Sequence, residues 1–152
     1  MNGSNHQPLV KILYIIPEGE EDAGLSESLW AYALGNNHYQ LQNIPVFAEH
    51  LSIEDEVLCD ELSDNLPVIR KIVRRSGNRT LRVLVRDETS EDMWQHILDE
   101  MHQRGIIWER ATSKSYMFNV APTDQYSSIR DLLKMQEDAG LIWLYEQLYD
   151  DD

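Results

Sequence analysis

The side chains best able to do chemistry in this sequence are one cysteine, five histidines and a large excess of carboxylates. Cys59 lies between Leu58 and Asp60 on a predicted strand, where a thiolate would be opposed by neighbouring acids. No G-x-S-x-G motif is present to activate a serine. With 27 Asp and Glu, no pair stands out for acid–base catalysis. We therefore expect a buried core thiol, no catalytic residue and no enzymatic activity.

Metal and cofactor binding are also not expected. The histidines stand at positions 6, 38, 50, 96 and 102, so no two are four residues apart on a helix face, and one cysteine cannot build a zinc cage. No loop has the ligand spacing of an EF-hand. The "PEGEEDAG" loop is acidic and lacks the lysine of a phosphate-binding loop. The sequence thus predicts no metal and no cofactor.

Charge is the most unusual property of the chain. The net charge is −14, yet Arg70–Arg86 holds seven of the 13 Lys and Arg and no acid. The rest of the sequence has 27 acids and 6 bases, a net charge of −21. Such a surface repels nucleic acid and anionic lipid and attracts basic proteins. We therefore predict a basic protein partner, and neither nucleic acid nor membrane.

The basic segment itself is predicted to be a hairpin, with strands at about residues 66–75 and 80–86 joined by the turn "SGNR". Strict alternation would place Arg70, Ile72 and Arg74 on one side of the first strand, and Arg82 and Arg86 on one face of the second. Three interpretations remain open. The arginines are compensated by nearby acids, or they form a solvated face that resists edge pairing, or, least favoured, they contact nucleic acid.

The elements that position these residues change character along the chain. Apolar or alternating runs predict strands at residues 9–16, 28–34, 38–44, 57–61, 66–75 and 80–86. Residues 89–104 have helical spacing that includes Met93 and Trp94, with Thr89 and Asp92 as a capping box and Gly105 as the stop. Strands follow at 106–112 and 115–121, then a helix from about 122 to Gly140 whose mainly apolar positions include Met135, and a strand at 141–149.

This order predicts an α+β fold with two halves. Residues 9–79 should form a curved antiparallel sheet or a partly open small barrel. Residues 80–149 have the ferredoxin-like order βαββαβ. The halves are expected to pack tightly, and together they could be one unit. Six aromatic residues are candidates either for the core, which is favoured, or for hot spots of a protein interface: Trp30, Tyr32, Tyr39, Trp143, Tyr145 and Tyr149.

The compartment is predicted from the single cysteine and from the first residues. Cys59 cannot form an internal disulfide. The beginning "MNGSNHQPLVKILYIIP" lacks a basic leader and a cleavage site, and no apolar run approaches the roughly 20 residues of a membrane span. These features favour the cytoplasm.

Several motifs resemble a known family. They are "LWAYAL" with Trp30, "YQLQNIPVFA" from Tyr39 to Ala48, the Asp55-x-Val57 pair and "SGNRTLRV" from Ser76 to Val83. Together they are similar to the bacterial family called domain of unknown function 4265, over roughly Ser26 to Gly140. The resemblance implies no activity. The acidic loop Glu18–Asp22 and the triple-Asp end are departures that we do not expect throughout the family.

The leading functional hypothesis is a non-enzymatic protein of immunity or antitoxin type that neutralises a basic toxin domain through clustered carboxylates. An alternative is a regulatory module that binds a small anionic ligand between the two halves with Arg70, Arg74 or Arg82 of the Arg70–Arg86 hairpin. An enzyme of unknown type is the third alternative. The carboxylates predicted to bind the partner are Glu18, Glu20, Glu21, Asp22, Glu54, Asp55, Glu56, Asp60, Glu61 and Asp64.

Overall fold

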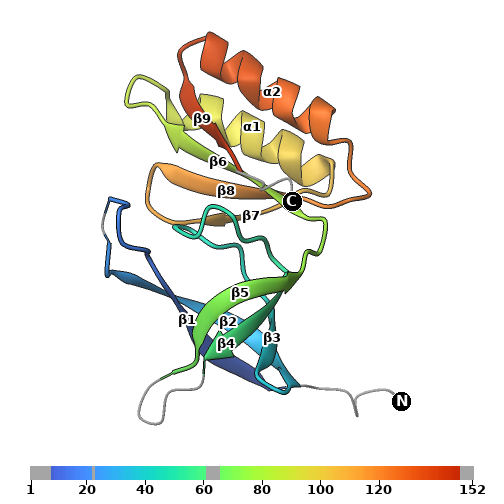
Figure 1. Cartoon of the computed structure of the whole chain (residues 1–152). Coiled ribbons are helices and arrows are strands. Elements are labelled where there is room, and N and C mark those ends of the chain that lie inside the picture. Colours follow the sequence, from blue (N-terminus) through green and yellow to red (C-terminus); the bar gives the residue numbers. More distant parts are fainter. Residues whose placement is uncertain (1–7, 22, 61–65, 148–152) are drawn as a thin grey trace. The chain divides into compact units, whose positions relative to one another are not determined.

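The structure is a computed structural model that describes residues 8–21, 23–60 and 66–147 (Figure 1). The chain divides into two compact units, Met1–Ser76 and Gly77–Asp152, and each has its own hydrophobic core. The sequence predicts the boundary between the two halves after residue 79, three residues later than in the structure. Neither of the described helices has both the length and the apolar character needed to cross a membrane.

The first unit is a closed five-stranded barrel. Its strands are β1 (Leu9–Ile15), β2 (Ser26–Gly35), β3 (His38–Leu41), β4 (Glu56–Asp60) and β5 (Val68–Arg74). Neighbouring strands are antiparallel, except that β1 meets β5 in parallel where Leu13 is opposite Val68. The predicted curved sheet is confirmed, and the parallel pair closes it into a barrel.

The predicted hairpin between β2 and β3 is also confirmed. Gly35, Asn36 and Asn37 have φ angles of 95°, 55° and 64°. Gly and Asn adopt this left-handed conformation more readily than other residues, which is why "GNN" turns the chain here. Inside the barrel, alternate residues of these strands form the core, and Ile12, Leu29 and Leu41 are completely buried.

Strand β5 does not follow the strict alternation predicted for it. Its register against β4 shifts twice, and Arg70 and Val73 are the residues left without a partner in β4. Each shift adds one residue to β5. The extra residue Arg70 lies between Ile69 and Ile72, so both isoleucines pack on the barrel core although they are three positions apart. The prediction that Ile72 shares a face with Arg70 and Arg74 was therefore wrong.

The second unit is a four-stranded antiparallel sheet with two helices. Its elements are β6 (Arg79–Val85), α1 (Glu91–Gln103), β7 (Ile107–Arg110), β8 (Ser115–Val120), α2 (Tyr126–Asp138) and β9 (Ile142–Glu146). The strand order is β7-β8-β6-β9, and both helices cover one face of the sheet (Figure 1). This order confirms the predicted ferredoxin-like arrangement.

The first helix begins one residue later than its predicted cap. The Ser90 hydroxyl accepts the N–H of Met93 at 3.2 Å, whereas the Thr89 hydroxyl donates to the carbonyl of Leu141 at 2.6 Å. The capping box predicted at Thr89 was thus wrong, because Thr89 ties the start of the helix to the chain before β9. Gly105 ends the helix as predicted, with a φ of 76°.

The core between helices and sheet contains most of the predicted apolar side chains but not all of them. Trp94 packs on Tyr116 and Phe118, with ring centroids 5.2 and 6.1 Å apart. Met93 and Met135, which the sequence groups with the apolar positions of their helices, are instead exposed by 47% and 65%. The 3.6-residue period does not determine whether residues at the edge of a helix's apolar face are buried, because a side chain there can point towards the core or towards solvent.

Arg70–Arg86 is not a hairpin. Both edges of β5 are occupied by β4 and β1, and both edges of β6 are occupied by β8 and β9. The two halves of the basic segment therefore belong to different sheets. The "SGNR" sequence still changes the chain direction, with a φ of 92° at Gly77, but it joins two units instead of two paired strands.

Two glutamates fasten α2 and β9 together. Glu137 accepts Lys134 Nζ at 2.6 Å and the N–H of Leu144 at 2.8 Å, and both interactions lower its pKa. The Tyr126 hydroxyl donates to Glu146 at 2.7 Å and Arg130 pairs with it at 3.0 Å, and these contacts lower the pKa of Glu146. Both carboxylates thus prefer the ionised form in the folded state.

This preference predicts an acid-sensitive contribution to stability. A carboxyl group with a lowered folded-state pKa stabilises the fold above its unfolded-state pKa, and that stabilisation is lost as the pH falls through the folded-state pKa. Urea unfolding should show wild type more stable than Glu146→Gln at about pH 7, by less than about 1 kcal/mol because the pair is partly exposed, with the gap closing near about pH 3. The control is Glu18→Gln, at an exposed glutamate of the first unit. A gap that stays constant with pH would contradict the assignment.

Candidate functional site

The connection between β3 and β4, residues 42–55, is irregular in backbone yet firmly held. Ile44, Ala48 and Leu51 are each exposed by 1% or less. Irregular segments with buried backbone need hydrogen-bond partners from elsewhere, because they have no ladder of their own. Two carboxylates and one arginine supply these partners.

Glu27 holds the first part of this connection. Its carboxylate accepts three backbone N–H groups, from Val46 at 2.6 Å, Phe47 at 2.9 Å and Ala48 at 3.2 Å. Glu27 stands on β2 and is only 9% exposed. Hydrogen bonds from N–H groups to a buried carboxylate are stronger than those between neutral groups. The backbone of residues 46–48 is therefore fixed to the barrel.

Asp55 holds the second part. Its two carboxylate oxygens accept the N–H groups of Ser52 at 2.9 Å and Ser76 at 2.8 Å, and the Ser76 hydroxyl donates to the carbonyl of Ile53 at 2.8 Å. Burial raises the pKa of Asp55, and the N–H donors act against that shift. Arg75 adds a hydrogen bond to the carbonyl of His50 at 3.1 Å. The family-like motifs around Asp55 and Ser76 thus meet in one network.

This anchored connection presents an aromatic side chain to solvent. Phe47 is 61% exposed although its own N–H is bound by Glu27. Glu49, two residues further on, is also exposed. A large exposed apolar side chain on a fixed backbone loses little conformational freedom on binding, which is the property of an interface anchor.

The turn between β1 and β2 brings further carboxylates to the same region. Burial raises the pKa of Tyr14, and the negative charges of Glu20, Glu27 and Glu49 raise it further, so all three carboxylates act on one phenol. The Tyr14 ring also contacts His50, with centroids 5.5 Å apart. We call this region the Phe47 surface, and we define it as Phe47, Glu49, Glu18, Glu20 and Glu21.

The predicted partner-binding acids fall into different environments. Glu18, Glu20 and Glu21 are exposed, and no salt bridge between described residues involves them. Asp55 is 1% exposed and serves the anchoring network instead of the surface. Glu54 and Asp60 are exposed, and Glu56 is half-buried on β4. Three of the predicted acids lie outside the described residues: Asp22, Glu61 and Asp64.

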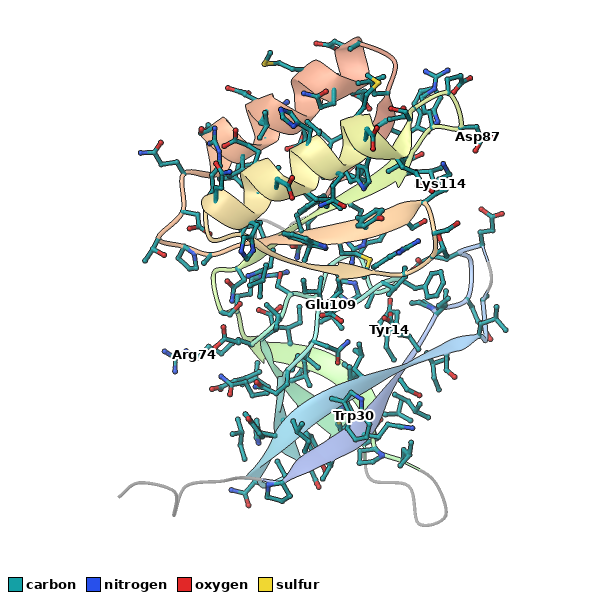
Figure 2. The ribbon with its side chains drawn as sticks, turned by 180° about the vertical axis from the view of Figure 1, so that it is seen from behind. Tyr14, Trp30, Arg74, Asp87, Glu109 and Lys114 are labelled. Carbon is teal, nitrogen blue, oxygen red and sulfur yellow. The ribbon has the colours of Figure 1, made fainter. Side chains whose placement is uncertain are left out.

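The predicted cationic residues are divided between the two units. Arg70 and Arg74 stand on β5 and Arg82 stands on β6. Arg70 is 3.9 Å from Asp60, and both side chains are more than half exposed, so this pair contributes little to stability. Arg74 extends from the barrel strand (Figure 2). The anionic-ligand site that the sequence suggested for these three arginines stays a prediction.

Nucleophile and metal chemistry find little support among the described residues. Cys59 is 3% exposed, and burial, with a further contribution from Asp60, raises its pKa to about 12. Its thiol is therefore neutral near neutral pH. Within residues 8–21, 23–60 and 66–147, no three His, Cys, Asp or Glu side chains gather closely enough to hold a metal ion.

Several aromatic residues expected in the core are on the surface. Trp30, Trp143 and Tyr145 are exposed by 48%, 46% and 56%, so the core prediction was wrong for these three. Trp30 lies on the outer face of the barrel, where Lys11 is 5.3 Å from its ring (Figure 2). Tyr32 and Tyr39 are half-buried, and Tyr149 lies outside the described residues.

Sequence reasoning did not single out Glu27, Phe47 or Glu49 as site residues. Glu27 carried a usable signal, because it occupies an inward position of β2 in series with Leu29 and Ala31. A carboxylate in a series of buried positions implies a buried partner. Phe47 was visible only as part of the "Asn-Ile-Pro-x-Phe" motif, and its exposure follows from the loop geometry.

The barrel, the βαββαβ sheet and the anchored loop define a small α+β protein built from two units. The chain belongs to the family described as Domain of unknown function (DUF4265), which matches residues 27–144 and confirms the resemblance. It is similar in fold to a solved structure described as "Novel crystal structure of a hypothetical protein from Neisseria gonorrhoeae", with 20% identity and a TM-score of 0.77 over 93% of this chain and 96% of that one. No curated protein matches the sequence.

Proposed function

We propose that this chain is a non-enzymatic binding protein that engages a basic protein through the Phe47 surface. The observation that carries the proposal is an exposed aromatic side chain on a loop whose backbone is fixed by Glu27, together with exposed carboxylates that form no salt bridge with another described residue. Aromatic anchors surrounded by charge are typical of protein interfaces. The loop is already ordered, so binding costs less conformational entropy.

The net charge of −14 indicates the chemistry of the partner. Clustered carboxylates steer a basic protein towards the surface and can occupy the site where a toxin domain binds phosphates. The particular form we propose is an immunity or antitoxin protein of the cytoplasm that neutralises such a domain. Nucleic acid and anionic membrane are not proposed as partners, since the same field repels both.

The test begins with capture from the native host at low salt and identification of the retained protein. The purified partner is then titrated against wild type, Phe47→Ala and the triple variant Glu18→Gln/Glu20→Gln/Glu21→Gln. Phe47→Ala should raise the dissociation rate about tenfold or more, because a buried aromatic anchor is lost. The triple variant should slow association and weaken its salt dependence.

Two control variants match these changes in chemistry. Met135→Ala removes an exposed apolar side chain from α2, and Glu91→Gln with Asp92→Asn removes exposed charges from α1. Both should leave the binding kinetics of the partner nearly unchanged. The proposal fails if the identified partner is acidic, if its affinity does not respond to salt, or if the controls weaken binding as much as Phe47→Ala does.

A further inference from the structure

We propose a second binding site, in the ferredoxin-like unit, for the carboxylate or phosphate group of a small molecule. It is a hollow of about 300 Å³ at one end of the sheet, where β6 leads towards α1 and the β7–β8 turn enters β8. Leu84, Arg86, Lys114 and Trp143 provide the contacts that the proposal uses. Its residues belong to the second unit, whereas the Phe47 surface belongs to the first, and the proposal is independent of the function proposed for that surface.

The pairing of the strands explains how these residues come together. Leu84 is directly opposite both Trp143 on β9 and Ser115 on β8. Leu81, Val83 and Val85 belong to the core beneath the helices, so Leu84 is on the other face of the sheet. Leu84 and Trp143 are exposed by 38% and 46% and form an apolar floor.

Two cations border this floor. The Arg86 guanidinium lies 4.5 Å from the centre of the Trp143 ring. Lys114 precedes Ser115, and its carbonyl accepts the N–H of Val85 at 2.8 Å, so the end of β6 holds its backbone. Figure 2 shows Lys114 and Asp87 near each other at this end of the unit.

Neither cation donates a hydrogen bond to a carboxylate within the described part of the chain. The Arg86 Nε is 3.7 Å from a Glu88 oxygen, which is beyond hydrogen-bond distance, and its guanidinium makes no hydrogen bond to a described residue. The Lys114 ammonium has no ion pair or hydrogen bond with a described residue. The two cations differ in this from Arg104, Arg130 and Lys134 of the same unit, each of which is within 3.0 Å of a carboxylate oxygen.

The arrangement fits an oxyanion better than other ligands. Contact with Trp143 orients the guanidinium plane, and its N–H donors can bind a carboxylate or phosphate in a two-point manner. The Lys114 ammonium supplies a second positive charge as a point donor. A volume of about 300 Å³ is at the small end of ligand pockets, so the ligand should be a small molecule.

Two carboxylates at the edge of the hollow repel a bound anion, and this repulsion leads to a specific prediction for Glu88. Asp87 and Glu88 also line the hollow, and a Glu88 oxygen is 3.7 Å from Arg86 Nε. Glu88→Gln removes a negative charge that competes with the ligand for the Arg86 guanidinium, and it leaves Arg86 and Lys114 unchanged. It should therefore tighten anion binding, whereas loss of either cation should weaken it.

The experiment titrates the full chain with inorganic phosphate, benzoate and phenyl phosphate, and follows the indole N–H resonances by NMR. We expect saturable binding that shifts the Trp143 resonance, assigned with Trp143→Leu. Comparing the affinities for phosphate and benzoate shows which class of oxyanion the site prefers. Comparing phenyl phosphate with phosphate shows whether Leu84 and Trp143 also contact a ring. Arg86→Gln and Lys114→Gln should each weaken binding about tenfold or more, as expected when a hydrogen bond to a charged group is lost.

Lys71→Gln is the matched control, since it makes the same change as Lys114→Gln at an exposed lysine of the other unit. It should leave the affinity unchanged, while Glu88→Gln should improve it several-fold. Should Arg86→Gln fail to fold, Lys114→Gln and Glu88→Gln still decide the matter. The proposal is overturned if no probe shows saturable binding, if Lys71→Gln weakens binding as much as Lys114→Gln, or if Glu88→Gln has no effect.

Discussion

Replacing Glu27 with glutamine is expected to lower the free energy of unfolding by about 3 kcal/mol, the loss of hydrogen bonds to a buried charged acceptor. The isosteric amide keeps one acceptor oxygen but turns an NH₂ group towards a backbone N–H that the carboxylate satisfied. One or more N–H groups of residues 46–48 would then be buried without a partner. Urea unfolding measures the loss, and hydrogen exchange should show faster exchange at Val46, Phe47 and Ala48.

Glu18→Gln provides the matched control for this prediction, because it makes the same chemical change at an exposed glutamate of the same unit. Its effect should lie within about 0.5 kcal/mol of wild type, as is usual for surface substitutions. If Glu27→Gln were equally mild and exchange at residues 46–48 did not change, Glu27 would not be the group that fixes the loop.

Gly77→Ala is expected to cost about 2–5 kcal/mol, which combines left-handed backbone strain with overpacking. Gly77 has a φ of +92°, and a Cβ atom there would be 2.9 Å from Cγ of Pro122. The proline ring is rigid, so the backbone would have to move to make room. Thermal and urea unfolding both report this loss.

Gly105→Ala separates the two causes within the same unit. Gly105 also has a positive φ, +76°, but an added Cβ would meet nothing within 4 Å. It should therefore show only the backbone cost of about 1 kcal/mol. Equal losses for the two variants would mean that the contact with Pro122 adds nothing at Gly77.

Local patterns in the sequence were sufficient for most of the elements and for the order of the second sheet. Apolar periodicity and the Gly and Asn turns identify the helices and the β2–β3 hairpin. They could not reveal that β5 and β6 belong to different sheets, since two consecutive strands with a turn usually pair with each other. The competing partners β1, β8 and β9 are far away in sequence and carry no local signal.

The candidate sites were harder to predict for a related reason. Charge counting pointed to Glu18, Glu20 and Glu21, which are indeed exposed, but it also selected Asp55, which is buried. Composition cannot distinguish a carboxylate that binds backbone N–H groups from one that faces water. The hollow beside Trp143 depends on cross-strand neighbours, and these became known only with the strand register.

The contact between Glu137 and Leu144 has a consequence for self-association. The barrel is closed, so the outermost described strands of the chain are β7 and β9 in the second sheet. An exposed strand edge can template the addition of a strand from another molecule, which is a first step towards aggregation. Glu137 occupies the N–H of Leu144 on β9 with a charged group that no incoming strand can use as a ladder partner. One helix-borne carboxylate thereby opposes the addition of a further strand at Leu144, in the way that edge lysines and prolines do elsewhere.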